Sequence, residues 1–568
     1  MNFRGSVRLL ILAVIASPAA AFNLPQMEIV SGPKAKVTKP TPKKTPKPTP
    51  KPAPKPVPTT SKKRKPLSTP TISKKKAPKP LSMPAASNPN LGNPSGVTAA
   101  PVVNKAEDYY KRGDSLVSNK SYAAAEAEYR KAIELEPNNA SLHGKLGYAL
   151  YQQDKYAEAE VHYRKAVAIN PDDASYNRFL GRVLYYQKKY AEAEPVMRKA
   201  VSLDPSDAYS HHELGYALVH QGKQAEAEPE FRKAVDLKQN DDVFLSSLGI
   251  NLQFQKKYAE AETVYKKAVA LDPKSIAHHI SLGQALYDQE KYAEAEAVYK
   301  TVLALEPNNP GNNNGLGMTL LEQKKYTEAE SAFRKAISIG PNVATYHNNL
   351  GSSLYYQEKY AEAEPEFRIA INLAPNNALY HDQLGEVLSK QKKNAEAESA
   401  YKKSIELNPD YTVAYISLGD ILFDQKRYAE AETAYRKVVN LSPDAYVFHW
   451  RLADIFLKQE KYAEAEVEYR KALHLDSDNV VYLQGLGEAL MMQKKYADAE
   501  PVYRQVIIIW PHDDSAYYTL GETLFMQEKY AEAEQVFKNL VSRSPKGIKA
   551  QSARDRLKLT REKLKKSK

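Results

Sequence analysis

The apolar and polar residues of this chain follow a pattern that repeats every 34 residues. The block Tyr-Ala-Glu-Ala-Glu marks this pattern. In the unit that spans residues 140–173, two sets of small and apolar side chains fall at the spacings of amphipathic helices. The first set is Leu146, Gly147 and Leu150, and the second is Ala159, Tyr163 and Ala166. Pro171 follows the second set, and proline stops a helix. The pattern predicts two helices per unit, joined by a polar turn.

Counted from Ala106, thirteen such units follow one another without a gap and end at residue 547. Position 8 is glycine in twelve units and Ala453 in the other, and position 20 is alanine in all thirteen. An aromatic residue or methionine follows four residues after that alanine in every unit. A fixed period of this length indicates stacked repeats, because no single unit can bury its apolar face alone. We therefore expect an all-α solenoid that presents a long surface.

The pattern resembles the tetratricopeptide repeat, with Leu-Gly, Ala, an aromatic residue, Ala and Pro at the spacing of that family. The resemblance covers 442 of the 568 residues. The chain departs from the family at position 4, which is mostly His, Tyr or Asn in place of Trp, and at Gln239 and Ser477, which replace the last proline. Four second helices contain an early proline: Pro195, Pro229, Pro365 and Pro501. The resemblance implies antiparallel helix pairs wound into a right-handed superhelix, whose first helices line a concave groove.

In this family the groove is lined mainly by positions 2, 5, 9, 12 and 13. In the N-terminal units these positions carry aromatic residues and arginine: Tyr148, Tyr151, Arg178, Arg182, Tyr185, Tyr186, His212 and Tyr216. Units 9 to 13 carry an acid at position 9: Glu386, Asp420, Asp454, Glu488 and Glu522. Apolar residues accompany these acids: Phe423, Trp450, Leu457, Met491, Met492, Phe525 and Met526. This stripe is typical of a surface for a basic, partly apolar peptide; the alternative is a solvated helix face.

Charged residues inside the units are expected to have a structural role. Glu158 and Glu160 lie in the first turn of a second helix, where the helix dipole favours anions. Glu160 also reaches Arg164 at i+4. The segment Gln187-Lys188-Lys189 is interpreted as the polar turn between two helices.

No enzyme, metal site or cofactor is predicted. The sequence has no Gly-rich phosphate loop, nucleophile elbow or His-Glu-x-x-His motif. Because it has no cysteine, disulfides and thiolate metal sites are excluded. Six histidines share position 4 of their units, but most are two units apart, too far to bind one zinc ion. They are His143, His211, His279, His347, His381 and His449, and we expect them to pack in place of the family's Trp.

Residues 1–21 have the layout of a secretory signal. Arg4 and Arg8 flank its start, an apolar run follows, and small residues precede a cleavage site between Ala21 and Phe22. This run is shorter than the roughly 20 residues that span a bilayer. We expect an exported protein of the periplasm, cell envelope or medium. The alternative is an uncleaved start on an intracellular protein, or on a nuclear one that uses the basic run at residues 62–65.

The two ends of the chain are basic. Residues 33–80, the Lys-Pro segment, contain sixteen Lys and Arg and no acid, so within the tail and linker (residues 22–105) we expect disorder with polyproline II character. Residues 548–568 read as a basic amphipathic helix that caps the array. Residues 1–105 carry +18 and residues 546–568 carry +8 of a total of +13, which leaves −13 on the repeats. The Lys-Pro segment can fold back on the array, hold an anionic surface, or act as a solvated spacer.

These patterns favour an exported, non-enzymatic scaffold that binds a polypeptide in its groove. The alternative is a structural spacer or tether in the cell envelope whose Lys-Pro segment binds an anionic surface. Specific nucleic-acid binding is not expected.

Overall fold

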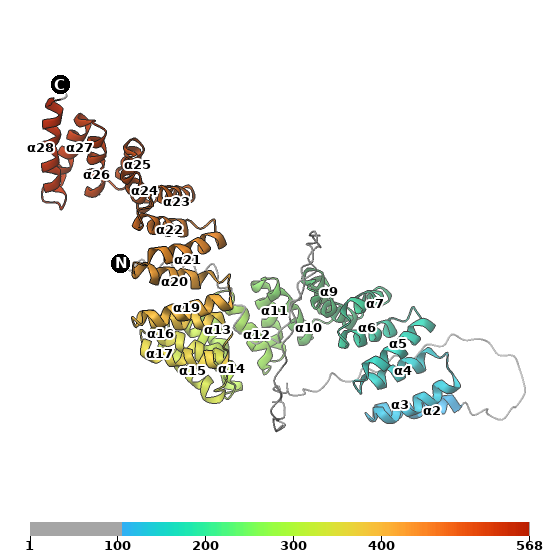
Figure 1. The fold of residues 1–568 in the computed structure, drawn as a ribbon. Helices are drawn as coiled ribbons and strands as arrows, with labels where there is room; N and C mark the ends of the chain where they lie inside the picture. The colour runs from blue at the N-terminus through green and yellow to red at the C-terminus, as the bar shows by residue number, and fades with distance from the viewer. Residues whose placement is uncertain (1–104, 567–568) are drawn as a thin grey trace, which may run out of the picture. The chain divides into compact units, whose positions relative to one another are not determined.

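The computed structural model describes residues 105–566, and this part of the chain forms 27 helices and no strand (Figure 1). The predicted signal, its cleavage site and the Lys-Pro segment lie outside the described residues. Twenty-six of the helices form thirteen pairs, one pair for each 34-residue unit, and the last helix follows them. The predicted all-α solenoid of thirteen repeats is therefore confirmed. The handedness of its superhelix stays a prediction.

The first helices of the repeats begin one period apart. They are α2 (Lys105–Ser118), α4 (Ala140–Tyr151), α6 (Ala174–Tyr186), α8 (Ala208–Val219), α10 (Asp242–Phe254), α12 (Ile276–Tyr287), α14 (Pro310–Glu322), α16 (Ala344–Tyr356), α18 (Ala378–Lys390), α20 (Thr412–Asp424), α22 (Tyr446–Lys458), α24 (Val480–Met492) and α26 (Asp514–Met526). The second helices are α3 (Tyr122–Leu135), α5 (Tyr156–Ile169), α7 (Tyr190–Leu203), α9 (Gln224–Leu237), α11 (Tyr258–Leu271), α13 (Tyr292–Leu305), α15 (Tyr326–Ile339), α17 (Tyr360–Leu373), α19 (Asn394–Leu407), α21 (Tyr428–Leu441), α23 (Tyr462–Leu475), α25 (Tyr496–Ile509) and α27 (Tyr530–Arg543). The chain ends in α28 (Ala550–Lys566).

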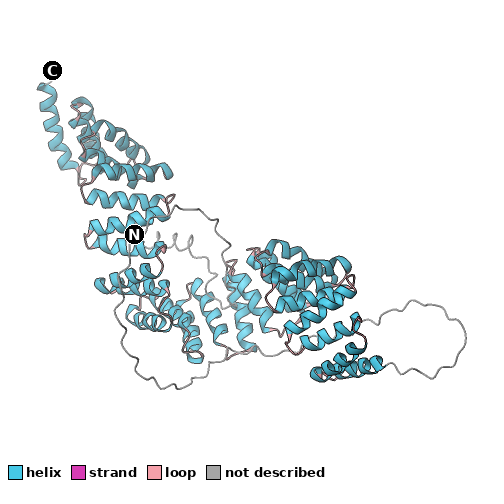
Figure 2. Cartoon of the chain, turned by 45° about the vertical axis from the view of Figure 1, so that its right-hand side comes forward, coloured by secondary structure: helices cyan, strands magenta, loops and turns pink. Residues whose placement is uncertain are grey.

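From α3 to α28, each helix packs against its neighbours in the chain, and only short loops separate them (Figure 2). First helices of neighbouring repeats also contact each other, as α10 does α12 and α14 does α16. First helices therefore lie side by side along one surface of the array. None of the described helices is long and apolar enough to cross a membrane. The second helices that contain Pro195, Pro229, Pro365 and Pro501 remain continuous through the proline.

Glycine at position 8 lets the two helices of a repeat approach each other. A Cβ atom on Gly147 would lie 2.9 Å from Cε2 of Tyr163. One on Gly317 would lie 2.5 Å from Cε1 of Phe333. Both rings are almost completely buried, so the aromatic residue at position 24 occupies the space that a side chain at position 8 would need. The small and large positions noticed in the sequence are thus in direct contact.

In repeat 11 the buried ring at position 24 packs against a different glycine. This repeat has Ala453 at position 8, and its ring at position 24 is Tyr469. This ring lies against Gly485 of the next repeat, where a Cβ atom would overlap it. A methyl group in one repeat is therefore accommodated by a glycine in the following one.

A buried ionic bridge joins consecutive repeats. Glu160 accepts hydrogen bonds from Lys189 Nζ at 2.8 Å and Gln187 Nε2 at 2.9 Å, both in the next repeat, as well as from Arg164 Nε at 2.8 Å. Only 12% of the Glu160 side chain is exposed. The sequence predicted the pair with Arg164, but it placed Gln187 and Lys189 in a polar turn between the helices of one repeat, with no contact to another repeat. They instead connect the repeats.

The same bridge recurs at every junction between repeats. The glutamate at position 21 meets a Lys or Arg at position 16 of the next repeat, with N···O distances of 2.5–3.0 Å over twelve junctions. We call this series the position-21 ladder. Residue 15, next to the Lys, adopts left-handed φ in every repeat, for example 61° at Lys324 and 76° at Gly222.

The last helix closes the array with a polar face. Ala550, Ala553 and Thr560 of α28 are buried, and α28 packs against α27. The residues of α28 that correspond to positions 7, 8 and 11 of a repeat are Arg554, Asp555 and Lys558, in place of Leu, Gly and Leu, and all three are exposed. No second helix can therefore pack on α28 as it does inside the repeats, which is the feature expected of a terminal cap.

Candidate functional site

The histidines at position 4 are engaged in structural contacts. In His347, Nε2 lies 2.9 Å from the carbonyl oxygen of Pro341, and Nδ1 lies 2.7 Å from Oε2 of Glu366. His449 has the same two contacts, with Pro443 and Glu468. Both ring nitrogens join the first helix to the preceding loop and to the second helix. Within residues 105–566, no group of three or more His, Asp or Glu side chains is placed to hold a metal ion.

The predicted aromatic residues of the N-terminal repeats form a continuous cluster. Tyr186 stacks on Tyr156, with centroids 5.2 Å apart and planes at 9°, and it also contacts Tyr151 at 5.6 Å. Tyr185 contacts Tyr216 at 6.4 Å. Tyr148 lies edge-on to Phe179 of the next repeat at 6.2 Å. The side chain of Tyr186 is 49% exposed, whereas the other rings of the cluster are less exposed. The cluster offers one open aromatic face.

Arg182, a predicted groove residue, is held by an ion pair. Its Nε donates to Oε1 of Glu213 at 2.8 Å, and its guanidinium lies 5.0 Å from the centroid of Phe179. Burial opposes the charged form, but Glu213 outweighs burial and raises the pKa of Arg182. Arg178 lies 3.2 Å from Asp207. These arginines are therefore compensated inside the array, and they do not form an open anion site.

The acids at position 9 are not a uniform negative stripe. Asp420 accepts from Arg451 Nη2 at 2.9 Å, and the same guanidinium lies 3.7 Å from Asp454. Arg556 of α28 pairs with Glu522. Glu386 accepts from the hydroxyl of Tyr355 at 2.8 Å. Two arginines thus neutralise three of the five acids.

Glu488, the remaining acid of this row, is exposed and has no ion pair with any described residue. The apolar neighbours are partly covered by the same arginines, which lie 4.2 Å from the Phe423 ring and 5.1 Å from the Phe525 ring. Trp450 packs on Tyr482 at 5.8 Å, and Met492 is 54% exposed. Sequence reasoning missed Arg451 because it stands at position 6, which was not counted among the lining positions.

One row of positions on the first helices exposes large apolar side chains. At position 13, the last residue of the first helix, Tyr186, Phe254, Tyr356, Met492 and Met526 are each 47–54% exposed. Asp288 and Glu322 occupy the same position in repeats 6 and 7, between Phe254 and Tyr356. We call these residues the position-13 row. The sequence identified Tyr186, Met492 and Met526 but not the middle of the row.

The middle of this row is acidic and aromatic. Tyr287 donates its hydroxyl to Glu322 at 3.2 Å, and Asp288 accepts from Gln284 at 2.7 Å. Tyr326 stacks on Tyr356 at 5.4 Å. Neither Asp288 nor Glu322 has a Lys or Arg ion-pair partner among the described residues. We call Tyr287, Asp288, Tyr292, Glu322, Tyr326 and Tyr356 the central patch.

Burial is the main cause of the pKa shifts in the central patch. Burial raises the pKa of Asp288 and of Glu322, although hydrogen bonds from Gln284 and Tyr287 act in the opposite direction. Burial, together with the charges of Glu322 and Glu290, raises the pKa of Tyr292 to about 12. Each carboxylate also stands at the C-terminal end of a first helix, where the helix dipole is negative. The patch therefore has the electrostatics of a site for a cationic group.

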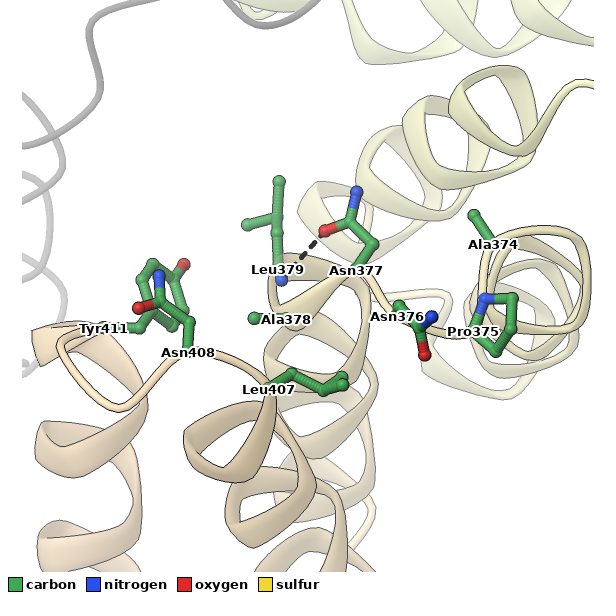
Figure 3. A pocket seen from close by; sticks show the side chains of 9 residues that line it. All are labelled: Ala374, Pro375, Asn376, Asn377, Ala378, Leu379, Leu407, Asn408 and Tyr411. Atoms are coloured by element: carbon green, nitrogen blue, oxygen red, sulfur yellow. Dashed lines mark hydrogen bonds between the residues drawn. The ribbon is translucent and has the colours of Figure 1, made fainter. Parts of the chain in front are cut away.

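A separate hollow of about 710 Å³ lies in the loops between repeats 8, 9 and 10 (Figure 3). It is lined by Ala374, Pro375, Asn376, Asn377, Ala378, Leu379, Leu407, Asn408 and Tyr411. Asn377 is occupied in capping α18, because its Oδ1 accepts from the backbone N–H of Leu379 at 3.0 Å. None of the predicted groove residues lines this hollow.

Three solved structures are among those to which this chain is similar. They are Pseudomonas aeruginosa pilF (21% identity, 37% of this chain and 95% of that chain covered, TM-score 0.34), yeast Tom70 (16%, 81% and 96%, 0.30) and a tetratricopeptide repeat protein from Parabacteroides merdae (18%, 44% and 99%, 0.34). No curated protein matches the sequence.

Three models of the tetratricopeptide repeat match the chain. The first matches residues 110–174, 180–242, 247–313, 280–344, 383–446, 416–480 and 451–514. The second matches residues 490–557 and the third residues 342–410. Together with the thirteen helix pairs, these matches establish that the chain belongs to the tetratricopeptide repeat family.

Proposed function

We propose that this chain is a non-enzymatic scaffold that binds a polypeptide along the surface formed by its first helices. Tetratricopeptide repeats serve in general as protein-interaction scaffolds. The observation that carries the proposal is the position-13 row, in which five large apolar side chains are about half exposed at the same place in their repeats. Apolar side chains that are exposed in register along one face are a feature of interaction surfaces.

The ligand that suits this surface is an extended or helical polypeptide that spans several repeats. The large apolar side chains of the row belong to repeats 3, 5, 8, 12 and 13. Because neighbouring helix layers lie about 10 Å apart, these side chains offer separate contacts over a long distance. Recognition by several moderate contacts on a rigid scaffold is the mode of groove-binding peptides. The exposed Glu488 near Met492 adds a contact for a basic residue in the C-terminal repeats.

The proposal includes export. The pattern of residues 1–21 favours a cleaved signal, and the absence of cysteine suits either redox compartment. A second candidate function is a spacer or tether in the cell envelope. The basic charge at both ends favours it, +18 on residues 1–105 and +8 on residues 546–568, because such segments bind anionic surfaces. In either case the Lys-Pro segment can also contact the repeats.

The test compares the full chain with two variants in a screen of immobilised peptides. In the first variant Tyr186, Phe254, Tyr356, Met492 and Met526 are changed to Ser. In the control, five exposed apolar residues of second helices, Leu135, Val161, Leu305, Val467 and Ile508, are changed to Ser. We expect peptides that bind the parent and the control to lose at least about tenfold in affinity for the first variant. Equal binding by all three proteins would refute a site on the position-13 row.

A further inference from the structure

We propose that the central patch binds the chain's own Lys-Pro segment, at residues 41–58, as a polyproline II helix. Its lysines pair with Asp288 and Glu322, and its prolines pack on the tyrosine rings. The inference rests on the proposed function, because it places a ligand on the same first-helix surface. It adds the identity of the ligand and the repeats that hold it, α12, α14 and α16, drawn in green to yellow in Figure 1.

The two carboxylates differ from the glutamates of the position-21 ladder, which all have a cationic partner. Every glutamate of the position-21 ladder from repeat 1 to repeat 12 has a Lys or Arg within 3.0 Å in the next repeat. Asp288 and Glu322 instead accept only neutral donors, Gln284, Gln253 and Tyr287. Since each carboxylate also stands at the negative end of a helix dipole, a lysine from outside the described residues would complete both contacts.

Two buried amide oxygens also lack a donor. Asn348 is 5% exposed, and its Oδ1 has no hydrogen-bond partner in the described part of the chain. It lies two turns before Tyr356 on the same face of α16. Gln284 donates its amide to Asp288, and its buried Oε1 is also without a partner there. A ligand that brings backbone or ammonium N–H groups to this face would satisfy them.

The aromatic part of the patch suits proline. Tyr356 is 49% exposed and is held by stacking on Tyr326, and Tyr292 lies edge-on to Tyr287, with centroids 5.4 Å apart and planes at 68°. Rigid aromatic faces in grooves are the usual receptors for polyproline II helices, which lose little entropy on binding. Residues 41–58 contain proline at nearly every second position, so their sequence favours this conformation.

The spacing of charges matches that of the repeats. Lys47, Lys51 and Lys55 recur every four residues, which is about 12 Å in a polyproline II helix at roughly 3.1 Å per residue. Asp288 and Glu322 stand at the same position of consecutive repeats, about 10 Å apart if ordinary helix packing applies. Consecutive lysines of the Lys-Pro segment can therefore reach consecutive carboxylates.

The segment between the proposed ligand and the first repeat is long enough for the ligand to reach the central patch. Residues 59–104 join the proposed ligand to the first repeat, and a flexible chain of this length has a root-mean-square span of roughly 35–40 Å and a much larger full extension. Repeat 7 lies six layers from repeat 1, roughly 60 Å along the array. This distance exceeds the root-mean-square span but not the full extension, so the tethered ligand has an effective concentration of at most about 1 mM, and moderate affinity keeps it bound.

The first experiment uses the absence of native cysteine. Cysteines are introduced in the full chain at Thr49 and Ser352, which lies on α16 between Asn348 and Tyr356. The control pair is Thr49 with Ser338, an exposed residue of second helix α15. At low salt we expect disulfide formation to be at least about tenfold faster for Thr49→Cys/Ser352→Cys than for the control, and the difference to disappear near 1 M salt. Equal rates for both pairs at low salt would overturn the proposal.

The second experiment tests whether the two carboxylates and the prolines are needed for binding. Asp288→Lys/Glu322→Lys is added to the first cysteine pair, and the charge-matched control is Glu134→Lys/Asp236→Lys, two exposed acids of second helices. We expect only the first change to abolish the fast cross-link. Replacing Pro46, Pro48, Pro50 and Pro52 by Ala while keeping every lysine should slow the cross-link as well. An unchanged rate in that variant would refute recognition of polyproline II.

The two proposals can fail separately. If the Ser352 pair does not cross-link while peptides still require the apolar residues of the position-13 row, the further inference is wrong and the scaffold function stands. If the cross-link forms but no added peptide depends on that row, the surface serves the chain's own segment and the proposed function is wrong. If neither result is obtained, both proposals are refuted.

Discussion

Arg561 of the last helix donates its Nε to Oε1 of Glu534 at 2.9 Å. Glu534 is the thirteenth glutamate at position 21, and at the twelve earlier ones a Lys or Arg of the next repeat fills this place. Helix α28 therefore continues the ionic ladder of the repeats while presenting Arg554, Asp555 and Lys558 where a repeat presents its apolar stripe. Helix α28 thus packs on α27 as the first helix of a repeat would, but its polar side chains prevent a further helix from packing on it.

Restoring the apolar stripe on α28 should make the chain associate. In Arg554→Leu/Asp555→Gly/Lys558→Leu, the helix regains the surface on which a second helix packs, and the described residues contain no second helix to cover it. We expect a larger, concentration-dependent sedimentation coefficient than that of the parent, because repeats with exposed apolar faces associate. The control is Lys563→Leu/Lys565→Leu/Lys566→Gly on the same helix. Identical sedimentation of parent and variant would contradict the capping role.

The position-21 ladder should make stability depend on acid pH. Hydrogen bonds from Lys300 and Lys325 lower the pKa of Glu296 to about 2. Burial raises the pKa of Glu160, but hydrogen bonds from Lys189, Arg164 and Gln187 outweigh it and also lower it to about 2. In an unfolded chain the pKa of glutamate is about 4.3. Because the pKa is depressed on folding, the stabilisation is complete above that value and is lost as the pH falls from there toward 2.

The measurement is the urea midpoint at a series of pH values from 7 to 2.5. We expect a plateau above about pH 5 and a steep fall below about pH 4.3. Changing Glu160, Glu296 and Glu364 to Gln removes three titrating groups, so the variant should be less stable at pH 7 and less sensitive to acid. The lysines of the ladder are about 40% exposed, so each bridge contributes only about 0.5 kcal/mol. A variant with the same pH slope as the parent would contradict the ladder as the source.

Gly317→Ala should destabilise the array although alanine favours helix. The substitution gains up to about 1 kcal/mol of helix propensity. It also places a Cβ atom 2.5 Å from the buried ring of Phe333, and overpacking costs about 1–3 kcal/mol. We expect a net loss of about 1 kcal/mol in urea unfolding, and recovery when Phe333→Leu is added. Ser331→Ala, exposed on α15, controls for propensity. A Gly317→Ala protein as stable as that control would show that the helices can separate without cost.

The period of 34 residues made the fold predictable, because Gly147 and Tyr163 mark a close helix pair by size alone. Contacts between repeats were harder to predict from the sequence. The spacing of 29 residues between Glu160 and Lys189 recurs throughout the sequence, and it would have identified the ladder had the turn been compared with the preceding repeat. Arg451 and the acids Asp288 and Glu322 gave no periodic signal, since position 6 is Arg only in repeat 11 and position 13 is acidic only in repeats 6, 7 and 10. Their roles emerge only when neighbouring first helices are placed side by side.

Lys324 carries a left-handed backbone that glycine would adopt with less strain. Its φ is 61°, its N–H donates to the carbonyl of Leu321 at 2.9 Å, and that of Lys325 donates to Leu320 at 2.9 Å, which together end α14. Left-handed φ costs a residue with a Cβ about 1 kcal/mol, and only repeat 4 avoids this cost, with Gly222. Lys324→Gly should therefore raise the free energy of unfolding by about 0.5–1 kcal/mol, and Gly222→Ala should lower it by a similar amount. Both are measured by urea titration at pH 7. Opposite signs are required, because a shift in the same direction for both would mean that loss of the lysine side chain, and not backbone strain, controls this turn.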